Sequence, residues 1–288
     1  MADGIQLLSP DDFPALLREI PDRPKRLYLR GKLPSEDMRY LAVVGSRAMS
    51  PYGRRACRYL VEGLRGYPIV IVSGLAYGVD AESHKAALNA GITSIGVPGS
   101  GLDWNVLYPK ANVGLAREIL ASGGCLLSEE KPDAKTMDYM FPKRNRIMAG
   151  ISHATLVVEA KEKSGTLITA RLVTEYNREL LVVPGSIFDE SSRGAHQFLR
   201  MGATAATCPE DILVALGIAK REGAASFADL REDLSDAERR VFELIAAPLP
   251  RDELMQALEL PVTDTNVLLS TMEIKGLIVE ELGVVRIK

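Results

Sequence analysis

Cysteine and histidine are scarce in this sequence, with three of each among 288 residues. Cys57, Cys125 and Cys208 are odd in number and far apart, which disfavours a disulfide framework and is typical of proteins in a reducing cytoplasm. The cysteines and histidines do not have the spacing of a zinc site. We therefore expect a cytoplasmic protein without a metal or other cofactor.

Long hydrophobic runs are also missing. The best apolar stretch is the short segment 67–72, far below the ~20 residues of a membrane span. The chain begins Met-Ala-Asp-Gly, and no basic segment followed by an apolar one comes after it, so we expect no secretory signal and no membrane partner. With 47% hydrophobic and 25% charged residues, the composition is that of a globular protein with a buried core.

The sequence has no large excess of charge of one sign. Its net charge is −3, and residues 219–288 hold 9 basic and 14 acidic side chains, which leaves 26 basic and 24 acidic in the rest. Neither part creates a strongly positive field. If the protein binds nucleic acid, it must do so through a local pocket of cations.

What the sequence has instead is a repeated pattern of buried strand, Gly/Ser turn and helix. The six predicted strands are 41–44, 69–72, 94–97, 125–128, 154–159 and 180–183. Continuous β-branched runs are typical of strands that are covered on both faces. Their alternation with helices predicts an α/β fold with a doubly wound, mostly parallel sheet.

The pattern also suggests how the chain is divided. We expect a lead-in over 1–34, the α/β domain over 35–218, a linker over 219–234 and a small domain over 235–288. The last region predicts helices over 235–246, 251–258 and 263–274 and then two short strands around Gly283, as in a winged helix. Ser235 and Glu238 would form a capping box. The acidity of this region favours contacts with proteins over contacts with duplex DNA.

Four loops at the predicted carboxyl edge of the sheet are rich in Gly and Ser. They are Gly45-Ser46-Arg47, Ser73-Gly74 with Gly78, Pro98-Gly99-Ser100-Gly101 and Ser164-Gly165-Thr166. Each opens a helix, where free N–H groups and the helix dipole favour anions. A single loop of this kind is more often only a tight turn. Several on one sheet edge indicate a ligand with phosphate groups.

The most distinctive local feature is the segment 141–147. It combines the cations Lys143, Arg144 and Arg146 with the amide of Asn145 and the ring of Phe141. Cations bind phosphates, an amide can read a base edge, and an aromatic ring can stack on an exposed base. The alternative is an exposed basic helix start with Phe141 in the core. A basic group at a helix start opposes the dipole, so the first interpretation is favoured.

The sequence offers no convincing catalytic constellation. Glu159, at the end of a predicted strand, is the most enzyme-like carboxylate. His84 falls inside a predicted helix, where packing or capping is its expected role. Asp80 and Asp103 could act as acids or bases, but no spacing singles them out.

The order and spacing of many short motifs resemble those of the DNA-processing protein A (DprA/Smf) family over about residues 14–218. The matching pieces are 27–31, 44–47, 73–80 with His84, 101–103 before Tyr108-Pro109, Ser128-Glu129, 141–150, 158–160, 164–170, 183–185 and Gly202-Ala203. Residues 235–288 match the family's winged helix more loosely. The sequence departs from the family pattern at Tyr77, which stands where an Arg is common.

The resemblance implies an extended Rossmann-like domain that binds single-stranded DNA, protects incoming strands in natural transformation and loads a RecA-type recombinase. It also implies a homodimer without enzymatic activity. By position, Arg47 and Lys143 would hold phosphates, aided by Arg146 and the loop N–H groups, while Phe141 and Asn145 would meet bases. The alternative is an enzyme similar to nucleoside-monophosphate phosphoribohydrolases, although the loop 162–166 has fewer glycines than theirs.

Overall fold

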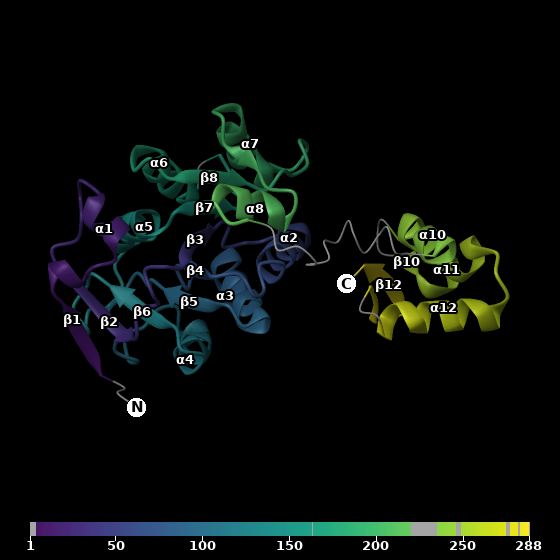
Figure 1. Ribbon diagram of the computed structural model, residues 1–288, viewed down its shortest axis with the longest axis horizontal. Helices are drawn as coiled ribbons and strands as arrows, with labels where there is room; N and C mark the ends of the chain where they lie inside the picture. Colours follow the sequence, from purple (N-terminus) through teal and green to yellow (C-terminus); the bar gives the residue numbers. More distant parts are fainter. Residues whose placement is uncertain are drawn as a thin grey trace. The chain divides into compact units, whose positions relative to one another are not determined.

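The computed structural model describes residues 4–162, 164–219, 235–245, 249–274, 277–281 and 283–287. The chain forms two compact units, Met1–Lys220 and Arg221–Lys288 (Figure 1). Of the predicted linker 219–234, all but Ala219 lies outside the described residues.

The first unit is built on one nine-stranded sheet, with the strand order β1-β2-β6-β5-β4-β3-β7-β8-β9. The strands are β1 (Ile5–Leu8), β2 (Leu27–Gly31), β3 (Arg39–Val44), β4 (Ile69–Ser73), β5 (Thr93–Gly96), β6 (Cys125–Ser128), β7 (Ala154–Val157), β8 (Glu179–Val182) and β9 (Thr204–Ala205). The neighbours from β6 to β9 are parallel, whereas β2 runs antiparallel to both β1 and β6. The predicted α/β fold with a mostly parallel sheet is confirmed.

The direction of winding reverses at the centre of this sheet. From β3 the chain adds β4, β5 and β6 on one side, and then returns to place β7, β8 and β9 on the other side of β3. In open α/β sheets such a reversal leaves a crevice beyond the carboxyl ends of the two central strands, and ligands bind there. The edge of interest is therefore the one where β3 and its neighbours end.

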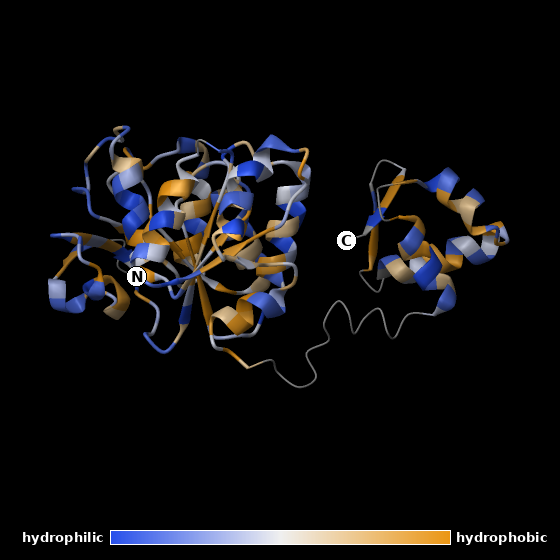
Figure 2. Ribbon diagram, turned by 90° about the horizontal axis from the view of Figure 1, so that it is seen from above, coloured by the Kyte–Doolittle hydropathy of each residue, from blue (hydrophilic) through white to orange (hydrophobic). Residues whose placement is uncertain are grey.

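Both faces of the sheet are covered by helices. Along β3, Leu41 and Val43 face one hydrophobic core while Ala42 and Val44 face another, as the two-residue period of a strand requires. Figure 2 shows the apolar strands between helices whose outer faces are more hydrophilic. Burial on both sides explains why these strands read as unbroken apolar runs.

The helices divide between the two faces. On one face are α1 (Ala15–Glu19), α5 (Met140–Ile151), α6 (Thr166–Glu175) and α7 (Glu190–Arg200). On the other are α2 (Pro51–Glu62), α3 (Val79–Ala90) and α8 (Pro209–Ala215), with α4 (Val113–Ala121) beside α3. Two short 3-10 helices, Pro10–Asp12 and Lys110–Asn112, complete the unit.

No strand is expected from the sequence before residue 35, yet β1 and β2 lie there and extend the sheet beyond β6 (Figure 1). Leu27 and Leu29 of β2 are buried, and Leu17 of α1 packs with residues of α5 in the same core. Residues 5–31 are thus part of the first unit's sheet and core.

The second unit contains α10 (Asp236–Leu244), α11 (Arg251–Leu258) and α12 (Val262–Ile274) with the strands β10 (Leu249–Pro250), β11 (Ile278–Glu281) and β12 (Val284–Ile287). The last two form a hairpin, and the sheet order is β10-β12-β11. The predicted capping box is confirmed: Ser235 N donates to Glu238 Oε2 (2.9 Å) and Glu238 N donates to Ser235 Oγ (3.3 Å). This arrangement is a winged helix, as predicted.

Within the described residues, no helix is long and apolar enough to cross a bilayer. The same residues contain no cluster of three or more His, Cys, Asp or Glu side chains that could hold a metal ion.

Candidate functional site

Two Gly-containing loops meet where β3 and β4 end. Val79 N, at the start of α3, donates to Ser46 O (3.1 Å), which ties the loop after β4 to the loop after β3. Gly78 has a φ of 75°, and a Cβ on it would lie 2.1 Å from Ser46 O. Gly78 therefore combines a left-handed backbone with a close approach that only glycine permits.

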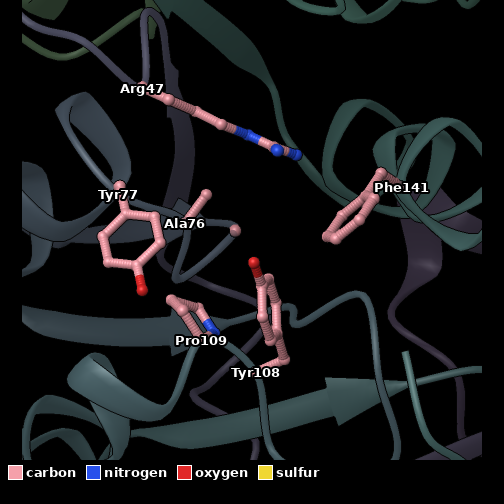
Figure 3. Close-up of a pocket in the computed structure, with 7 residues that line it drawn as sticks. Arg47, Ala76, Tyr77, Tyr108, Pro109 and Phe141 are labelled. Carbon is pink, nitrogen blue, oxygen red and sulfur yellow. The ribbon is translucent and has the colours of Figure 1, made fainter. Parts of the chain in front are cut away.

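Beside these loops is a small hollow. It is lined by Arg47, Gly74, Ala76, Tyr77, Tyr108, Pro109 and Phe141 (Figure 3). The Arg47 guanidinium carbon lies over the Phe141 ring, 4.6 Å from its centroid. The Tyr108 and Phe141 rings are 6.0 Å apart with 58° between their planes. Arg47, Tyr77 and Tyr108 are all exposed, so this hollow offers a cation and aromatic rings to a ligand.

Phe141 is fixed by the loop after β5. A Cβ on Gly99 would lie 2.7 Å from the Phe141 ring, so the ring packs directly against the Gly99 backbone. Phe141 is not simply a core residue, which was the alternative expected from the sequence. Its ring is half-buried and also lines the hollow. A ring held in this way loses little conformational entropy when a ligand stacks on it.

The cations of the 141–147 segment face different surroundings. Arg144 is buried at 7% exposure: its Nη1 donates to Val97 O (2.6 Å) and lies 3.9 Å from Asp80 Oδ2. Burial lowers the pKa of Arg144 and raises that of Asp80, while their mutual attraction opposes both shifts. Arg144 thus joins α5 to the loop after β5 and to α3, directly beneath Gly74.

Lys143 and Arg146 lie against the loop after β6. Lys143 Nζ is 2.9 Å from Glu130 Oε1 and 3.5 Å from Glu129 Oε2, and Arg146 Nη2 is 2.5 Å from Glu129 Oε2. The Lys143 side chain remains 37% exposed, whereas that of Arg146 is 12% exposed. A phosphate that reached Lys143 would compete with these carboxylates. Asn145 is buried.

The remaining predicted site residues are less central. Ser73 is fully buried, and its hydroxyl donates to Val43 O (2.6 Å), a contact between β4 and β3. Ser164, Gly165 and Thr166 begin α6 beyond β7, and the Ser164 hydroxyl accepts from Thr166 N (3.2 Å). The structure thus brings Arg47, Gly74 and Phe141 together, while Ser164–Thr166 are not among the residues that line the hollow.

Glu159 and His84 are both engaged in the fold. Glu159 is 2% exposed and accepts hydrogen bonds from Ser50 N (3.0 Å), from the Ser50 hydroxyl and from the Ser191 hydroxyl (3.5 Å). Its carboxylate therefore holds the starts of α2 and α7. His84 is fully buried in α3, and burial lowers its pKa to about 4, so the ring is neutral.

Tyr77 and Tyr108 were not among the site residues predicted from the sequence. Tyr77 follows the Gly-containing turn after β4, and Tyr108-Pro109 follows the Gly-rich loop after β5. Their position beyond strand ends was the available signal, since side chains in these loops project at the ligand-binding edge.

Comparisons with known proteins agree with the two units. The model of the DNA recombination-mediator protein A family matches residues 5–217, and that of the DprA winged helix domain matches residues 225–283. Protein Smf of Escherichia coli K12 is 43% identical over 201 residues, which are 70% of this chain and 53% of that protein. DNA processing protein DprA of Streptococcus pneumoniae R6 is 41% identical over 203 residues, which are 70% of this chain and 71% of that protein.

Two solved structures are also similar. The X-ray structure of DprA from Streptococcus pneumoniae has a TM-score of 0.68 and 39% identity, covering 73% of this chain and 74% of that one. A structure of DNA processing protein A from Helicobacter pylori, described for its single-stranded DNA binding mode, has a TM-score of 0.65 and 28% identity, covering 74% and 95%. This chain spans about half the length of its Escherichia coli relative.

Proposed function

Because this chain belongs to the DNA recombination-mediator protein A family, we propose that it binds single-stranded DNA in the hollow between Arg47 and Phe141. The observation that carries the proposal is the exposed guanidinium of Arg47 above the Phe141 ring, with Tyr77 and Tyr108 beside them. Proteins that bind single strands combine cations for the backbone with aromatic rings on which bases stack.

The hollow suits a single strand better than a duplex. Its aromatic rings can meet the faces of bases only where those bases are unstacked. The first unit also has no strong excess of positive charge to attract a duplex backbone. Arg47 would hold a phosphate, and Phe141 would stack on a base with the two tyrosines at the sides.

The other predicted site residues support this hollow in the proposal. Gly74 gives the ligand access to the backbone, while Gly45, Ser46 and Gly78 shape the loop that carries Arg47. Lys143 offers a second cation, with Arg146 next to it. Arg144 lies buried beneath Gly74 and supports the hollow through its hydrogen bond to Val97 O. The Ser73 hydroxyl joins β4 to β3 through Val43 O, and Asn145 is buried in α5. Ser164, Gly165 and Thr166 would meet a strand that continues past β3.

We further propose that the bound strand is protected and passed to a RecA-type recombinase, during natural transformation or other recombination, by a homodimer of this chain. The description of the matching family as a recombination mediator supports this step. A mediator of this kind acts by binding, so we propose no catalytic activity for this chain. The test is the rate at which a RecA-type recombinase assembles on single-stranded DNA, which should rise when this protein is bound to that DNA.

The primary experiment is a fluorescence-anisotropy titration with labelled single-stranded and duplex DNA at several salt concentrations. Arg47→Ala should weaken single-strand binding and lower the slope of log K against log salt by about one, because one phosphate contact is lost. Wild-type protein should prefer the single strand. Wild-type affinity in Arg47→Ala, or equal affinity for duplex, would refute the proposal.

Arg65→Ala is the matched control. Arg65 is also an exposed arginine, but it lies between α2 and β4, at the opposite edge of the sheet, where its Nη2 donates to Asn89 O (2.9 Å). Its removal subtracts the same charge from the protein. Equal losses in the two variants would show that net charge matters and the hollow does not.

A further inference from the structure

A second hollow lies at the same edge of the sheet, where the winding reverses between β3 and β7. Its lining comes from the loops after β3, β7 and β8: Ala48, Ser50, Lys161, Ser186, Phe188, Asp189, Glu190 and Ser191. It is broad and open to solvent. The general rule for doubly wound sheets places a ligand at this reversal, and the Arg47–Phe141 hollow lies to one side of it, over β3, β4 and β5.

The charges at this hollow disfavour a phosphate. The starts of α2 and α7 both face it, but buried Glu159 already accepts from Ser50 N, and Asp189 Oδ1 accepts from Ser191 N (2.9 Å). Glu190 adds a further carboxylate, and among the described residues that line the hollow Lys161 is the one cation. Carboxylates accept hydrogen bonds from N–H donors, so the hollow suits an uncharged group that carries an amino group.

Phe188 stands at the rim with 89% of its surface exposed. Its backbone is nevertheless held in place, because Phe188 N donates to Ser186 Oγ (3.3 Å) and Asp189 N donates to Ser186 O (3.1 Å). The carbonyl oxygen of Pro184, two residues before Ser186, accepts from the Tyr52 hydroxyl (2.5 Å), which ties this loop to α2. An aromatic ring that is this exposed, on a hydrogen-bonded loop, is available as a stacking surface.

We propose that this second hollow binds a nucleobase of the same single strand, stacked on Phe188, with a preference for bases that carry an exocyclic amino group. Such an amino group, as in cytosine or adenine, donates to the carboxylate of Glu190 or Asp189. Thymine has no exocyclic amino group. The inference rests on the proposed function, because it assigns a further subsite for the same ligand.

The two hollows are neighbours along the chain and along the sheet. Arg47 lines the first hollow and the next residue, Ala48, lines the second, so the loop after β3 borders both. Adjacent strands are about 4.8 Å apart, and the hollows are centred about two strands from each other, so about 10 Å separates them. A strand of several nucleotides can therefore occupy both.

The test compares Phe188→Ala with Ile187→Ala in titrations against a single strand that is long enough to span both hollows. Loss of one stacked base should weaken binding about 5- to 150-fold in Phe188→Ala, with an unchanged slope of log K against log salt because no phosphate contact is lost. Phe188→Tyr should restore the affinity. Ile187 is a neighbouring exposed apolar residue at 73% exposure outside the lining, so Ile187→Ala should bind as wild type does.

The base preference gives a second readout. Wild-type protein should bind oligo-dC about 3- to 10-fold more tightly than oligo-dT through a hydrogen bond to a carboxylate, and Glu190→Gln should reduce this ratio. If Arg47→Ala weakens binding but Phe188→Ala matches Ile187→Ala, the second subsite is refuted. If Arg47→Ala binds as wild type does, the proposed function itself fails.

Discussion

Gly74 is the position where one added methyl group should do the most damage. A Cβ on Gly74 would lie 1.5 Å from Arg144 Nη1 and 2.4 Å from Asp80 Oδ2. Both of those groups are buried, and Arg144 Nη1 also donates to Val97 O. In Gly74→Ala the guanidinium must therefore leave its place, because the far end of this side chain is enclosed by the fold.

The expected cost follows from what Arg144 loses. Displacement breaks a hydrogen bond to a charged donor, worth about 1.5–3 kcal/mol, and separates the buried Arg144–Asp80 pair, for which removal of one partner costs about 3–5 kcal/mol. Because these losses overlap, we expect Gly74→Ala to lower the free energy of unfolding by about 3–5 kcal/mol. With an m-value of about 2–3 kcal/mol/M, the urea midpoint falls by about 1–2.5 M.

Gly114→Ala is the matched control. Gly114 lies on the exposed side of α4, and a Cβ there would meet nothing within 4 Å. The same substitution should therefore raise the free energy of unfolding by about 0.5–1 kcal/mol, since alanine is the better helix former. The two Gly→Ala changes thus have opposite predicted signs.

Trp104 provides the assay. It is the only tryptophan of the chain and packs half-buried in the first unit, so its fluorescence follows the unfolding of that unit alone. Urea titrations of wild type, Gly74→Ala and Gly114→Ala give the three midpoints. A Gly74→Ala midpoint at or above that of wild type would refute the placement of Arg144 beneath Gly74.

Three further predictions concern other parts of the first unit. Burial lowers the pKa of His84 to about 4, below the ~6.5 of an unfolded histidine, so the unfolded chain binds the extra proton. Stability should therefore fall as the pH drops through this window, by about 2 kcal/mol at about pH 5, and the ring signals of His84 in NMR should not titrate above that pH. Glu130→Gln should raise single-strand affinity about 2- to 5-fold in anisotropy titrations, because the pair with Lys143 no longer competes with phosphate; unchanged affinity would contradict this. Arg117→Ala should cost about 0.5–1 kcal/mol in urea unfolding and alter the emission of Trp104, whose ring centroid lies 4.7 Å from the Arg117 guanidinium carbon.

The central strands were predictable because their burial is local information. A strand covered on both faces is apolar at most positions, and β3, β4 and β7 show such runs directly in the sequence. β1 and β2 carry no such signal, since Gln6 and Leu7 of β1 are exposed and β2 pairs with β6 across about a hundred residues. Pairing over that separation is set by the folded core, which a local pattern does not contain.

The site was predictable to the extent that it lies at strand ends. Arg47 and Phe141 follow from loop position and composition, and the structure places them in contact. The buried position of Arg144 was not predicted, because the sequence places it among the cations expected to bind phosphates; its helical spacing from Ile147 and Met148, which share the inward face of α5, was the available signal. Nothing in the sequence marks Phe188 as a ligand-binding residue, because the sequence of a loop does not show whether its aromatic ring is exposed or buried.

The distribution of carboxylates predicts which cation binds DNA most strongly. Arg144 is matched by Asp80, and Lys143 is matched by Glu129 and Glu130. Among the described residues, Arg47 has no ion pair, and its guanidinium rests on the Phe141 ring. A phosphate at Arg47 displaces no carboxylate, whereas a phosphate at Lys143 must displace or share one. Arg47→Ala should therefore weaken single-strand binding more than Lys143→Ala and lower the salt slope by about one, against a smaller change for Lys143→Ala. Equal slopes in the two variants would mean that the carboxylates move away when DNA binds, and that the charge balance of the free protein does not set the order.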